Sequence, residues 1–369
     1  MKVAYFIGSL NRGGTEMLTL DICCKKNYVP YEIILIYRNE GDLSEEFRAS
    51  GVPMFRIKPK GVKIGYFGKL RKLVKEENVS IVHAQSMINA AIAVLFTLFT
   101  KVKLVVSFHG FFRSVSMSVL WQTVMWNADA MVFVSGVVRD WYYKRSLYCP
   151  KQRCNVVYNG INFEKFDRKY EIPDFLAEEY NGVKKMRFVM VGNFVSGRSQ
   201  IVVCKSLKLL KDQGVTGFDF YFVGKRVDSE SWRYDECVGY CEQYGLDFVH
   251  FVGSRGDVPA ILQHVDGFVY STFDDTFGIA VVEAMAVGIP VIVNDWDVMK
   301  EITLQGKYAT LFETENEEDC AAKIKELVSS NEVFRCKMLK NVVEIRELYS
   351  IEKHIMNLYE IYNTLNKCN

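Results

Sequence analysis

Several features that would point to other classes of protein are missing from this sequence of 369 residues. The formal net charge is only +2, whereas nucleic-acid binding usually goes with a strong basic excess, so we expect no nucleic-acid partner. The ten cysteines form no CxxC pair, and Cys237 and Cys241 have no second pair of ligands at the spacing of a zinc site. The cysteines therefore predict no zinc site. Scattered thiols, with an N-terminal apolar run too short for a secretory signal, predict a cytoplasmic protein.

Long apolar runs are missing as well. The longest covers residues 87–99, is interrupted by Asn89 and Thr97, and falls short of the roughly 20 residues that cross a bilayer. We expect it to form a buried helix. The composition is otherwise that of a globular protein, with 49% hydrophobic and 24% charged residues, and the length suits two domains of ordinary size.

Short apolar runs alternate with segments of helix length, which is typical of α/β proteins with parallel sheets. We expect strands at residues 3–7, 32–37, 54–57, 81–84, 104–108, 130–134 and 155–158. After a polar stretch the pattern begins again, with strands at residues 187–191, 219–223, 249–252, 267–270 and 291–293. The sequence thus predicts two doubly wound, Rossmann-like domains that face a central cleft: residues 1–165 and 186–348. A linker at 166–185 joins them, and a C-terminal helix within 349–369 is expected to return to the first domain.

Residues 268–293 hold the most informative pattern. A buried strand is followed by a polar loop, and a helix begins near Phe277 or Gly278. Such a turn directs unpaired N–H groups and the positive end of the helix dipole toward a ligand, which suits phosphate. Asp275 lies in the loop and Glu283 in the helix, so both carboxylates could accept hydrogen bonds from vicinal hydroxyls of a sugar or a ribose. The plainer interpretation is that Asp275 caps the helix and Glu283 faces solvent.

The same segment resembles the donor-binding motif of glycosyltransferase family four, the retaining enzymes of the GT-B fold. In that motif two glutamates are separated by seven residues, and here Asp275 and Glu283 stand at the two positions, with Thr276 in place of a usual glycine. The other residues that match in register are Phe277, Gly278, Ala284, Met285, Ala286, Gly288, Pro290, Val291 and Ile292. Weaker matches extend the resemblance over nearly the whole chain.

The resemblance implies a GT-B fold and transfer of a sugar from a nucleotide-diphosphate sugar, with a UDP-sugar as the expected donor and no cofactor or metal. In the family the second acid binds the ribose and the first approaches the donor sugar, which assigns these roles to Glu283 and Asp275. Backbone amides near the helix start would face the diphosphate, at Thr276, Phe277, Gly278 and Ile279. Because Asp275 is shorter than glutamate, we expect the sugar contact to differ.

Shorter motifs supply the remaining site residues by resemblance. Asn193 and Arg198 stand where the family has an arginine and a lysine that clamp the diphosphate, and Arg198 keeps a forked guanidinium for phosphate. His109 ends a strand where the family has a histidine near the donor sugar, so the candidate catalytic residues are His109, Asp275 and Glu283. Gly13 and Gly14 would lie beside the donor phosphates, and Gly224, Val252 and Gly253 beside the nucleotide. His83 is expected to be structural.

A basic cluster in the first half bears on the acceptor. It comprises Arg56, Lys58, Lys60, Lys63, Lys69, Arg71, Lys72 and Lys75. Such a face could rest on anionic lipid headgroups, which fits a peripheral enzyme at the inner face of the membrane acting on a lipid-linked or glycan acceptor in bacterial polysaccharide or lipopolysaccharide synthesis. A solvated helix face is an equal alternative, because Glu76 and Glu77 end the run.

The sequence also bears on three alternative functions. A sugar-nucleotide epimerase shares the fold but is expected to carry further acidic and histidine residues. A catalytically silent GT-B subunit remains an alternative because Asp275 and Asn193 depart from the usual pattern. A nicotinamide-dependent oxidoreductase needs a GxGxxG motif that residues 8–14 lack. The DxD motif of Asp295 and Asp297, which holds metal in other glycosyltransferases, is interpreted as a coincidence.

Overall fold

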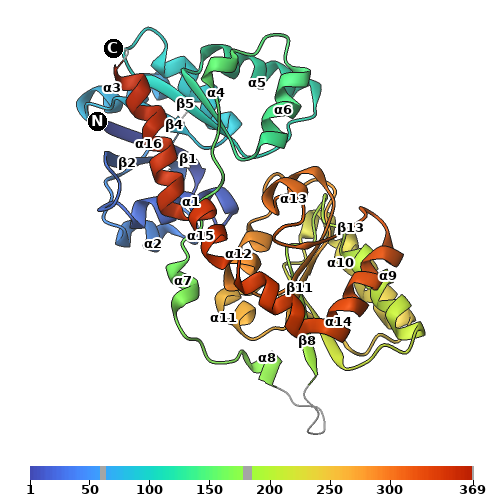
Figure 1. Cartoon of the computed structure of the whole chain (residues 1–369). Coiled ribbons are helices and arrows are strands. Elements are labelled where there is room, and N and C mark those ends of the chain that lie inside the picture. The colour runs from blue at the N-terminus through green and yellow to red at the C-terminus, as the bar shows by residue number, and fades with distance from the viewer. Residues whose placement is uncertain (59–63, 178–184, 368–369) are drawn as a thin grey trace. The chain divides into compact units, whose positions relative to one another are not determined.

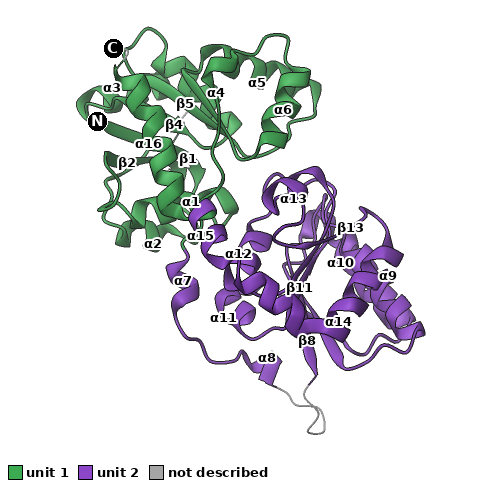
Figure 2. Cartoon of the chain, viewed as in Figure 1, with its two compact units in different colours: residues 1–162, 349–369 green, residues 163–348 purple. Residues whose placement is uncertain are grey.

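The computed structural model describes residues 1–58, 64–177 and 185–367, which divide into two compact units (Figure 2). Unit 1 comprises residues 1–162 and 349–369, and unit 2 comprises residues 163–348. Two short helices, α7 (Glu164–Asp167) and α8 (Asp174–Ala177), overlap the segment predicted as a linker. Residues 178–184 of that segment lie outside the described residues, as do Lys60 and Lys63 of the basic cluster.

Unit 1 is built on a parallel sheet of seven strands in the order β3-β2-β1-β4-β5-β6-β7. Figure 1 labels four neighbouring strands of this sheet, β2, β1, β4 and β5. The strands are β1 (Lys2–Ser9), β2 (Glu32–Asn39), β3 (Met54–Arg56), β4 (Ile81–Ala84), β5 (Lys103–Phe108), β6 (Ala130–Phe133) and β7 (Cys154–Val156). All seven predicted strands of the first half are present. They were recognisable because central parallel strands are covered on both faces and are therefore apolar along their length, as in β1.

The helices of unit 1 connect these strands and cover the sheet. They are α1 (Gly14–Cys24), α2 (Ser44–Ala49), α3 (Ile64–Glu76), α4 (Met87–Thr97), α5 (Val115–Asn127), α6 (Gly136–Arg145) and the C-terminal α16 (Ile351–Lys367), with a 3₁₀ turn at Lys151–Arg153. The helix α16 belongs to the core of this unit: Tyr362 is fully buried, and its hydroxyl lies 2.5 Å from His83 Nδ1 and 3.3 Å from the Tyr5 hydroxyl. His83 Nε2 also contacts Ser107 Oγ at 2.8 Å, so His83 joins α16 to β4 and β5 and is structural, as expected.

The helix α4 corrects one prediction. Residues 87–99 were expected to form a buried helix, but Ile88 and Leu95 are each 55% exposed and Phe99, just beyond the helix, is 95% exposed. The side of α4 that faces the sheet is buried, and there Phe96 contacts the ring of Phe6. The hydropathy of a segment shows how apolar it is, but it does not show which sides of the helix are packed against other elements.

Unit 2 repeats the architecture with a parallel sheet of six strands in the order β10-β9-β8-β11-β12-β13. The strands are β8 (Met186–Val191), β9 (Phe218–Val223), β10 (Val249–Gly253), β11 (Gly267–Tyr270), β12 (Val291–Asn294) and β13 (Thr310–Phe312). The helices are α9 (Gln200–Asp212), α10 (Ser231–Gln243), α11 (Val258–Gln263), α12 (Ile279–Val287), α13 (Asp297–Ile302), α14 (Glu317–Leu339) and α15 (Val342–Tyr349), with a 3₁₀ turn at Asp228–Glu230. The five predicted strands are present, and the short edge strand β13 was missed.

Each sheet reverses its strand order once. In unit 1 the chain crosses from one side of β1 to the other, so that β1 neighbours β4, and in unit 2 β8 likewise neighbours β11. The connections that leave the carboxyl ends of these paired strands run in opposite directions and leave room between them. Ligands of doubly wound sheets bind at such a switch point, so the structure directs attention to the residues that follow β1, β4, β8 and β11.

Candidate functional site

An ion pair crosses the switch point of unit 2. Arg198 follows β8 and Asp275 follows β11, and Arg198 Nη1 lies 2.9 Å from Asp275 Oδ2. The two side chains are only 23% and 10% exposed, so solvent screens their attraction less than at an open surface. The same Oδ2 accepts a hydrogen bond of 2.8 Å from the buried Tyr270 hydroxyl. Strand order thus brings together two charges that are far apart in the sequence.

The second oxygen of Asp275 shapes the loop. Oδ1 accepts hydrogen bonds from the amides of Thr276, at 2.9 Å, and Phe277, at 3.4 Å. A carboxylate offers about four acceptor positions, and here two side chains and two amides fill them. Trp296 Nε1 donates to the Asp275 carbonyl at 3.2 Å and fixes the main chain as well. A sugar hydroxyl could bind this carboxylate only by replacing one of these donors.

Arg198 stays charged although it is largely buried. Burial by itself lowers the pKa of the guanidinium, but Tyr270 and Asp275 beside it raise that pKa overall. Its carbon Cζ lies 5.2 Å from the centre of the Tyr270 ring, and burial keeps the Tyr270 phenol protonated by raising its pKa. Arg198 Nε is buried and has no hydrogen-bond partner within the described part of the chain. An unpaired N–H on a fixed cation is a donor available for an anionic ligand.

Two glycines allow Arg198 to lie across the sheet edge. A Cβ atom on Gly192, at the end of β8, would lie 3.4 Å from Arg198 Nε. A Cβ atom on Gly224, at the end of β9, would lie 2.0 Å from the Gly192 carbonyl oxygen, which no side chain can tolerate. The Gly224 amide donates to the Gly253 carbonyl at 2.8 Å, so the predicted residues Gly224, Val252 and Gly253 lie at the adjoining ends of β9 and β10.

The predicted anion-binding helix is α12. It begins at Ile279, one residue beyond the predicted start, and Gly278 precedes it with φ of +81°, where a Cβ atom would also lie 2.8 Å from Met299 Cε. Amides of a first turn have no acceptor within the helix, so those of Gly278 and Ile279 are available as donors to a ligand. Glu283 lies one turn further along, and it shares partial exposure with Ile279 and Ala280 at helical spacing. The start of the helix and Glu283 are therefore on one accessible face.

Asn193 occupies the position where the resembling family has an arginine. Its Oδ1 accepts a hydrogen bond of 2.9 Å from the amide of Lys225, so it joins the ends of β8 and β9 and carries no charge. Lys225 is exposed, and it forms no ion pair among the residues that the structure describes. This lysine directly follows Gly224 and was missed by the sequence analysis. The signal was present, because the residue after a strand-ending glycine lies at the ligand edge of such a sheet.

The DxD residues point to different partners. Asp295 Oδ1 accepts hydrogen bonds from Thr314, at 2.9 Å from the amide and 2.7 Å from the hydroxyl. Asp297 instead pairs with Lys300 at 3.0 Å within α13. Within the described ranges, no cluster of three or more histidine, cysteine, aspartate or glutamate side chains could hold a metal ion.

The remaining predicted residues belong to unit 1. His109 follows β5, and its Nε2 lies 3.1 Å from Gln85 Oε1. Burial lowers the pKa of His109 to about 4, so its imidazole is neutral near pH 7. Gly13 precedes α1 and Gly14 begins it, but the Glu16 side chain lies against Gly13, since a Cβ atom there would be 2.6 Å from Glu16 Oε2. An anion beside these glycines would therefore meet an acidic neighbour.

Comparison with known families follows the same division of the chain. The family described as Glycosyltransferase Family 4 matches residues 12–165, and the family described as Glycosyl transferases group 1 matches residues 174–344. One model therefore covers most of unit 1, and the other covers nearly all of unit 2.

Two curated relatives are of particular interest. The N,N'-diacetylbacillosaminyl-diphospho-undecaprenol alpha-1,3-N-acetylgalactosaminyltransferase of Campylobacter jejuni is 26% identical over 213 residues, 56% of this chain and 54% of the relative. The UDP-Gal:alpha-D-GlcNAc-diphosphoundecaprenol alpha-1,3-galactosyltransferase of Escherichia coli is 23% identical over 249 residues, 61% of this chain and 60% of the relative. The matched region thus spans little more than half of the first relative and three fifths of the second.

Solved structures resemble the whole chain. HepE of Anabaena, in complex with UDP and glucose, superposes with a TM-score of 0.84 and covers 99% of this chain and 100% of its own. Its sequence identity of 15% limits this likeness to the fold. The fold is that of two Rossmann-like domains of the GT-B type, so the predicted fold class is confirmed.

Proposed function

Because the chain belongs to glycosyltransferase family four and has the GT-B fold, we propose that it transfers a sugar from a UDP-sugar to a lipid-linked glycan acceptor in the synthesis of a cell-surface polysaccharide. One observation carries the proposal: a fixed guanidinium with an unpaired Nε and the start of α12 both flank the switch point of unit 2. A cation beside a helix N-terminus suits the diphosphate of such a donor. UDP occurs in the names of a galactosyltransferase relative and of a solved structure with this fold, which supports the choice of nucleotide.

The roles in donor binding follow from the chemistry of each group. Glu283 accepts hydrogen bonds from the ribose hydroxyls, and Arg198 binds the diphosphate together with the amides of Gly278 and Ile279. The Asn193 amide and the Lys225 ammonium add donors beside them, and Lys225 supplies the charge that Asn193 lacks. Gly224, Val252 and Gly253 lie where the strand ends can adjoin the nucleotide. These cationic and dipolar groups stabilise the departing diphosphate, so the reaction needs no metal.

Asp275 positions Arg198. Its carboxylate accepts bonds from Arg198, Tyr270 and two loop amides, and it holds the guanidinium at the switch point. A glutamate at this position would carry the charge about one methylene further and would displace Arg198. The donor sugar then lies beside the loop of Thr276 and Trp296. In unit 1, the neutral imidazole of His109 can form a hydrogen bond with a sugar hydroxyl.

Transfer proceeds with retention of the anomeric configuration. The bond between the anomeric carbon and the diphosphate oxygen breaks, and the acceptor oxygen bonds to the same face of that carbon. The proton of the acceptor hydroxyl passes to the departing phosphate oxygen, so no protein nucleophile is consumed. The protein contributes orientation and stabilisation of the charge that develops on the diphosphate.

The donor assignment is tested with Glu283→Ala and with Glu326→Ala, a matched control at an exposed glutamate of α14. We expect UDP-glucose to raise the melting temperature of the wild type and the control, with GDP- and ADP-sugars doing so less. Loss of two charge-assisted bonds should weaken UDP-sugar binding by about a hundredfold or more in Glu283→Ala.

Turnover of Glu283→Ala near the wild-type rate would rule out the ribose contact. Donor binding without any transfer or hydrolysis would favour a silent subunit, and loss of activity in EDTA would contradict metal independence.

A lipid-linked acceptor requires a surface that meets the membrane, and α4 and α5 offer one. Neither helix contains a charged residue, and the two pack against each other in unit 1. Their outward sides and the segment after α6 expose Ile88, Leu95, Leu98, Phe99, Val115, Val119, Trp126, Leu147 and Tyr148. Gln122 joins that segment to α5 through a bond of 2.8 Å to the Tyr148 carbonyl. We call these residues the apolar face. A helix that faces water normally carries polar residues there, so this face is suited to a nonaqueous partner.

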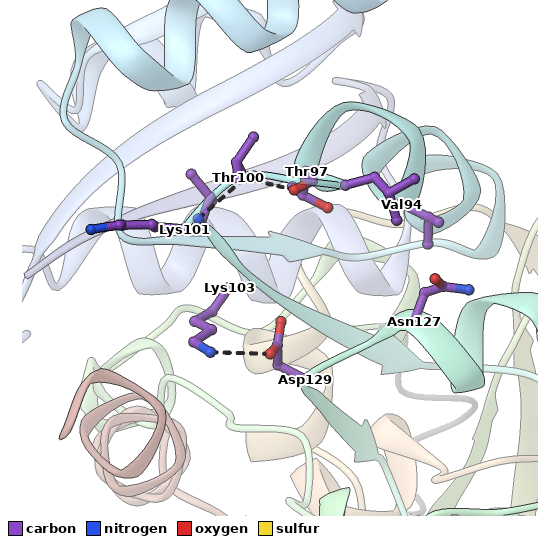
Figure 3. Close-up of a pocket in the computed structure, with 9 residues that line it drawn as sticks. Val94, Thr97, Thr100, Lys101, Lys103, Asn127 and Asp129 are labelled. Carbon is purple, nitrogen blue, oxygen red and sulfur yellow. Dashed lines mark hydrogen bonds and ion pairs between the residues drawn. The ribbon is translucent and has the colours of Figure 1, made fainter. Parts of the chain in front are cut away.

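The charges around the apolar face favour an anionic membrane over a second protein. No aspartate or glutamate occurs between Glu77 and Asp129, and cations border the apolar residues at Lys101, Lys103, Arg113, Lys144, Arg145, Lys151 and Arg153. A cavity of about 310 Å³ lies between the ends of α4 and α5. Figure 3 shows residues that line it, among them Lys101 and the ion pair of Lys103 with Asp129, whose charged atoms are 3.5 Å apart. Lysine near anionic headgroups adds to the attraction that apolar side chains provide.

The basic cluster of the sequence analysis contributes less directly. Arg71 donates hydrogen bonds to the carbonyls of Phe96 and Leu98, so it holds the end of α4, and Lys72 pairs with Glu76. Reversing the charge of Arg71 would disturb α4 itself and would be a poor test of membrane contact. No helix within the described residues is long and apolar enough to cross a bilayer, and the association that we propose is peripheral, at the cytoplasmic face.

Membrane association is tested with the triple variant Ile88→Ser, Leu95→Ser and Leu147→Ser. We expect it to bind vesicles that contain phosphatidylglycerol at least about tenfold more weakly than the wild type, and the wild type to bind pure phosphatidylcholine poorly. A matched control changes Val333 and Val343, two exposed apolar residues of unit 2, to serine. Equal binding of all three proteins would contradict the proposal. A wild-type dimer that the triple variant converts to a monomer, without vesicle binding, would assign the apolar face to a second copy.

A further inference from the structure

Buried polar atoms without partners gather at the switch point of unit 1. Arg38 Nε, Tyr66 Oη and Asn89 Oδ1 are each shielded from solvent and form no hydrogen bond within the described residues. They come from three elements: Arg38 from the end of β2, Tyr66 from α3 and Asn89 from the first turn of α4. Burying even one such group without a partner is unfavourable, so their presence at the ligand edge of the sheet indicates a ligand.

Gly8, near the end of β1, shows that two of these side chains converge. A Cβ atom on Gly8 would lie 3.0 Å from Arg38 Nη2 and 3.9 Å from Asn89 Nδ2, so both side chains reach the space above this glycine. Asn89 Nδ2 donates to the Phe6 carbonyl at 3.3 Å, which fixes the amide and leaves Oδ1 as an acceptor. Arg38 and Asn89 thus present a cationic donor and a neutral acceptor to one place beside β1.

The charge of Arg38 is not balanced by a carboxylate in the part of the chain that the structure describes. Glu40, two residues later, is engaged by Arg48 at 3.0 Å and Arg56 at 3.6 Å. Burial raises the pKa of Tyr66 and the charge of Arg38 acts against that shift, so Tyr66 is near Arg38 and remains a protonated donor. A half-buried guanidinium without a counter-ion at the ligand edge of a sheet is a site for an anion.

Unit 2 contains the same arrangement at its own switch point. There Arg198 lies over Gly192 at the end of β8, as Arg38 lies over Gly8 near the end of β1, and Arg198 Nε and Ser271 Oγ are likewise buried and unpaired. The two sites differ in their charge, because Asp275 partners Arg198 whereas no described carboxylate partners Arg38. Unit 1 therefore has the stronger requirement for an anion from outside the chain.

We propose that Arg38, Tyr66 and Asn89 bind the phosphorylated sugar of the acceptor. Arg38 and Tyr66 donate hydrogen bonds to phosphate oxygens, and Asn89 Oδ1 accepts one from a sugar hydroxyl. This site rests on the proposed lipid-linked acceptor and specifies its chemistry: the sugar is joined to the lipid through phosphate, and the enzyme recognises that phosphate directly. Acceptors that present the same sugar on a neutral alkyl chain are then poor substrates.

The test compares the wild type, Arg38→Gln, Arg38→Lys and Tyr66→Phe with two acceptors, one sugar diphosphate lipid and one neutral octyl glycoside of the same sugar. We expect Arg38→Gln to lose about thirtyfold or more in kcat/KM for the diphosphate acceptor and to leave the octyl glycoside unchanged. Arg38→Lys should recover part of the loss, because lysine keeps the positive charge but lacks the paired N–H donors of the planar guanidinium. Tyr66→Phe should lose about fivefold. Arg139→Gln, at another arginine of unit 1, is the matched control.

Two further measurements separate this inference from the proposed function. Hydrolysis of UDP-sugar without acceptor should be equal in the wild type and Arg38→Gln, and its absence from both would count against the proposed function alone. With UDP present at saturating concentration to occupy the proposed donor site, inorganic pyrophosphate should further raise the melting temperature of the wild type and not that of Arg38→Gln, whether or not transfer is observed. Equal protection of both proteins, or an Arg38→Gln defect confined to the KM for the donor, would overturn the inference.

Discussion

At the scale of single residues, the pairing of Arg198 with Asp275 changes the interpretation of the donor motif. From the sequence, Asp275 was expected to approach the donor sugar and Arg198 the diphosphate, as separate contacts. In the structure the two side chains form one unit with Tyr270, whose hydroxyl and the guanidinium meet the same carboxylate oxygen. The departure from glutamate at position 275 then has a physical reason, since the shorter side chain brings its oxygens to both the loop amides and Arg198.

This pairing predicts a strong energetic coupling. Asp275→Asn leaves Arg198 buried without a counter-charge and should lower the free energy of unfolding of unit 2 by about 3 kcal/mol. Arg198→Gln should cost less, because Asp275 keeps its other donors. In a double-mutant cycle measured by urea denaturation, we expect a coupling energy of about 1–3 kcal/mol. Additive single effects would show that the two charges act independently.

At the scale of elements, close contact between strand ends positions the site. The ends of β8 and β9 approach each other through Gly192 and Gly224, and only this approach lets Arg198 lie over the edge of the sheet. The turn before α12 depends similarly on Gly278, whose positive φ starts the helix at the loop of Asp275. Backbone geometry, more than side-chain identity, therefore sets where the donor groups point.

A matched pair of glycine substitutions tests this dependence. Gly224→Ala places a methyl group 2.0 Å from the Gly192 carbonyl oxygen, so the strand ends must separate, and we expect a loss of about 2–3 kcal/mol or more in unfolding free energy together with weaker UDP-sugar binding. Gly239→Ala lies in the exposed middle of α10, where nothing is near the added methyl group, and should stabilise the protein by about 0.5–1 kcal/mol. Equal melting temperatures for the two variants would contradict the account.

At the scale of the whole molecule, unit 1 contains three histidines that are neutral in the folded state. Burial lowers the pKa of His109 and His354 to about 4 and that of His83 well below its usual value. His83 and His354 also hold the C-terminal helix α16, through Tyr362 and through a 2.7 Å contact with the Tyr158 carbonyl. The free energy of unfolding of this unit therefore depends on pH.

Acidification should weaken unit 1 over a defined range. Each histidine has a lower pKa folded than unfolded, where it is about 6.5, so the unfolded chain binds more protons. The contribution of these histidines to the free energy of unfolding is fully present above pH 6.5. It decreases as the pH falls toward about 4, by up to about 1.4 kcal/mol per pH unit for each histidine. Denaturation at several pH values, with His354→Gln for comparison, checks this: the variant should lose stability less steeply. A flat profile between pH 7 and 4.5 would contradict the prediction.

The sequence by itself determined the fold class, the family motif and twelve of the thirteen strands found in the described residues. This was possible because buried parallel strands are apolar along their whole length, and because the turn from strand to phosphate-binding helix requires particular residues at short spacing. The edge strand β13 was missed because its three residues carry no periodic pattern.

Only the tertiary structure decided which distant residues meet. Strand order brings Asp275 to Arg198, and it brings the side chains of Arg38 and Asn89 to the same glycine, Gly8, arrangements that no local pattern contains. It also left one side of α4 and α5 uncovered, so that an apolar segment expected in the core forms a surface. Hydropathy and spacing act along the chain, whereas charge pairing, orphaned polar groups and exposed apolar faces depend on which elements the fold places side by side.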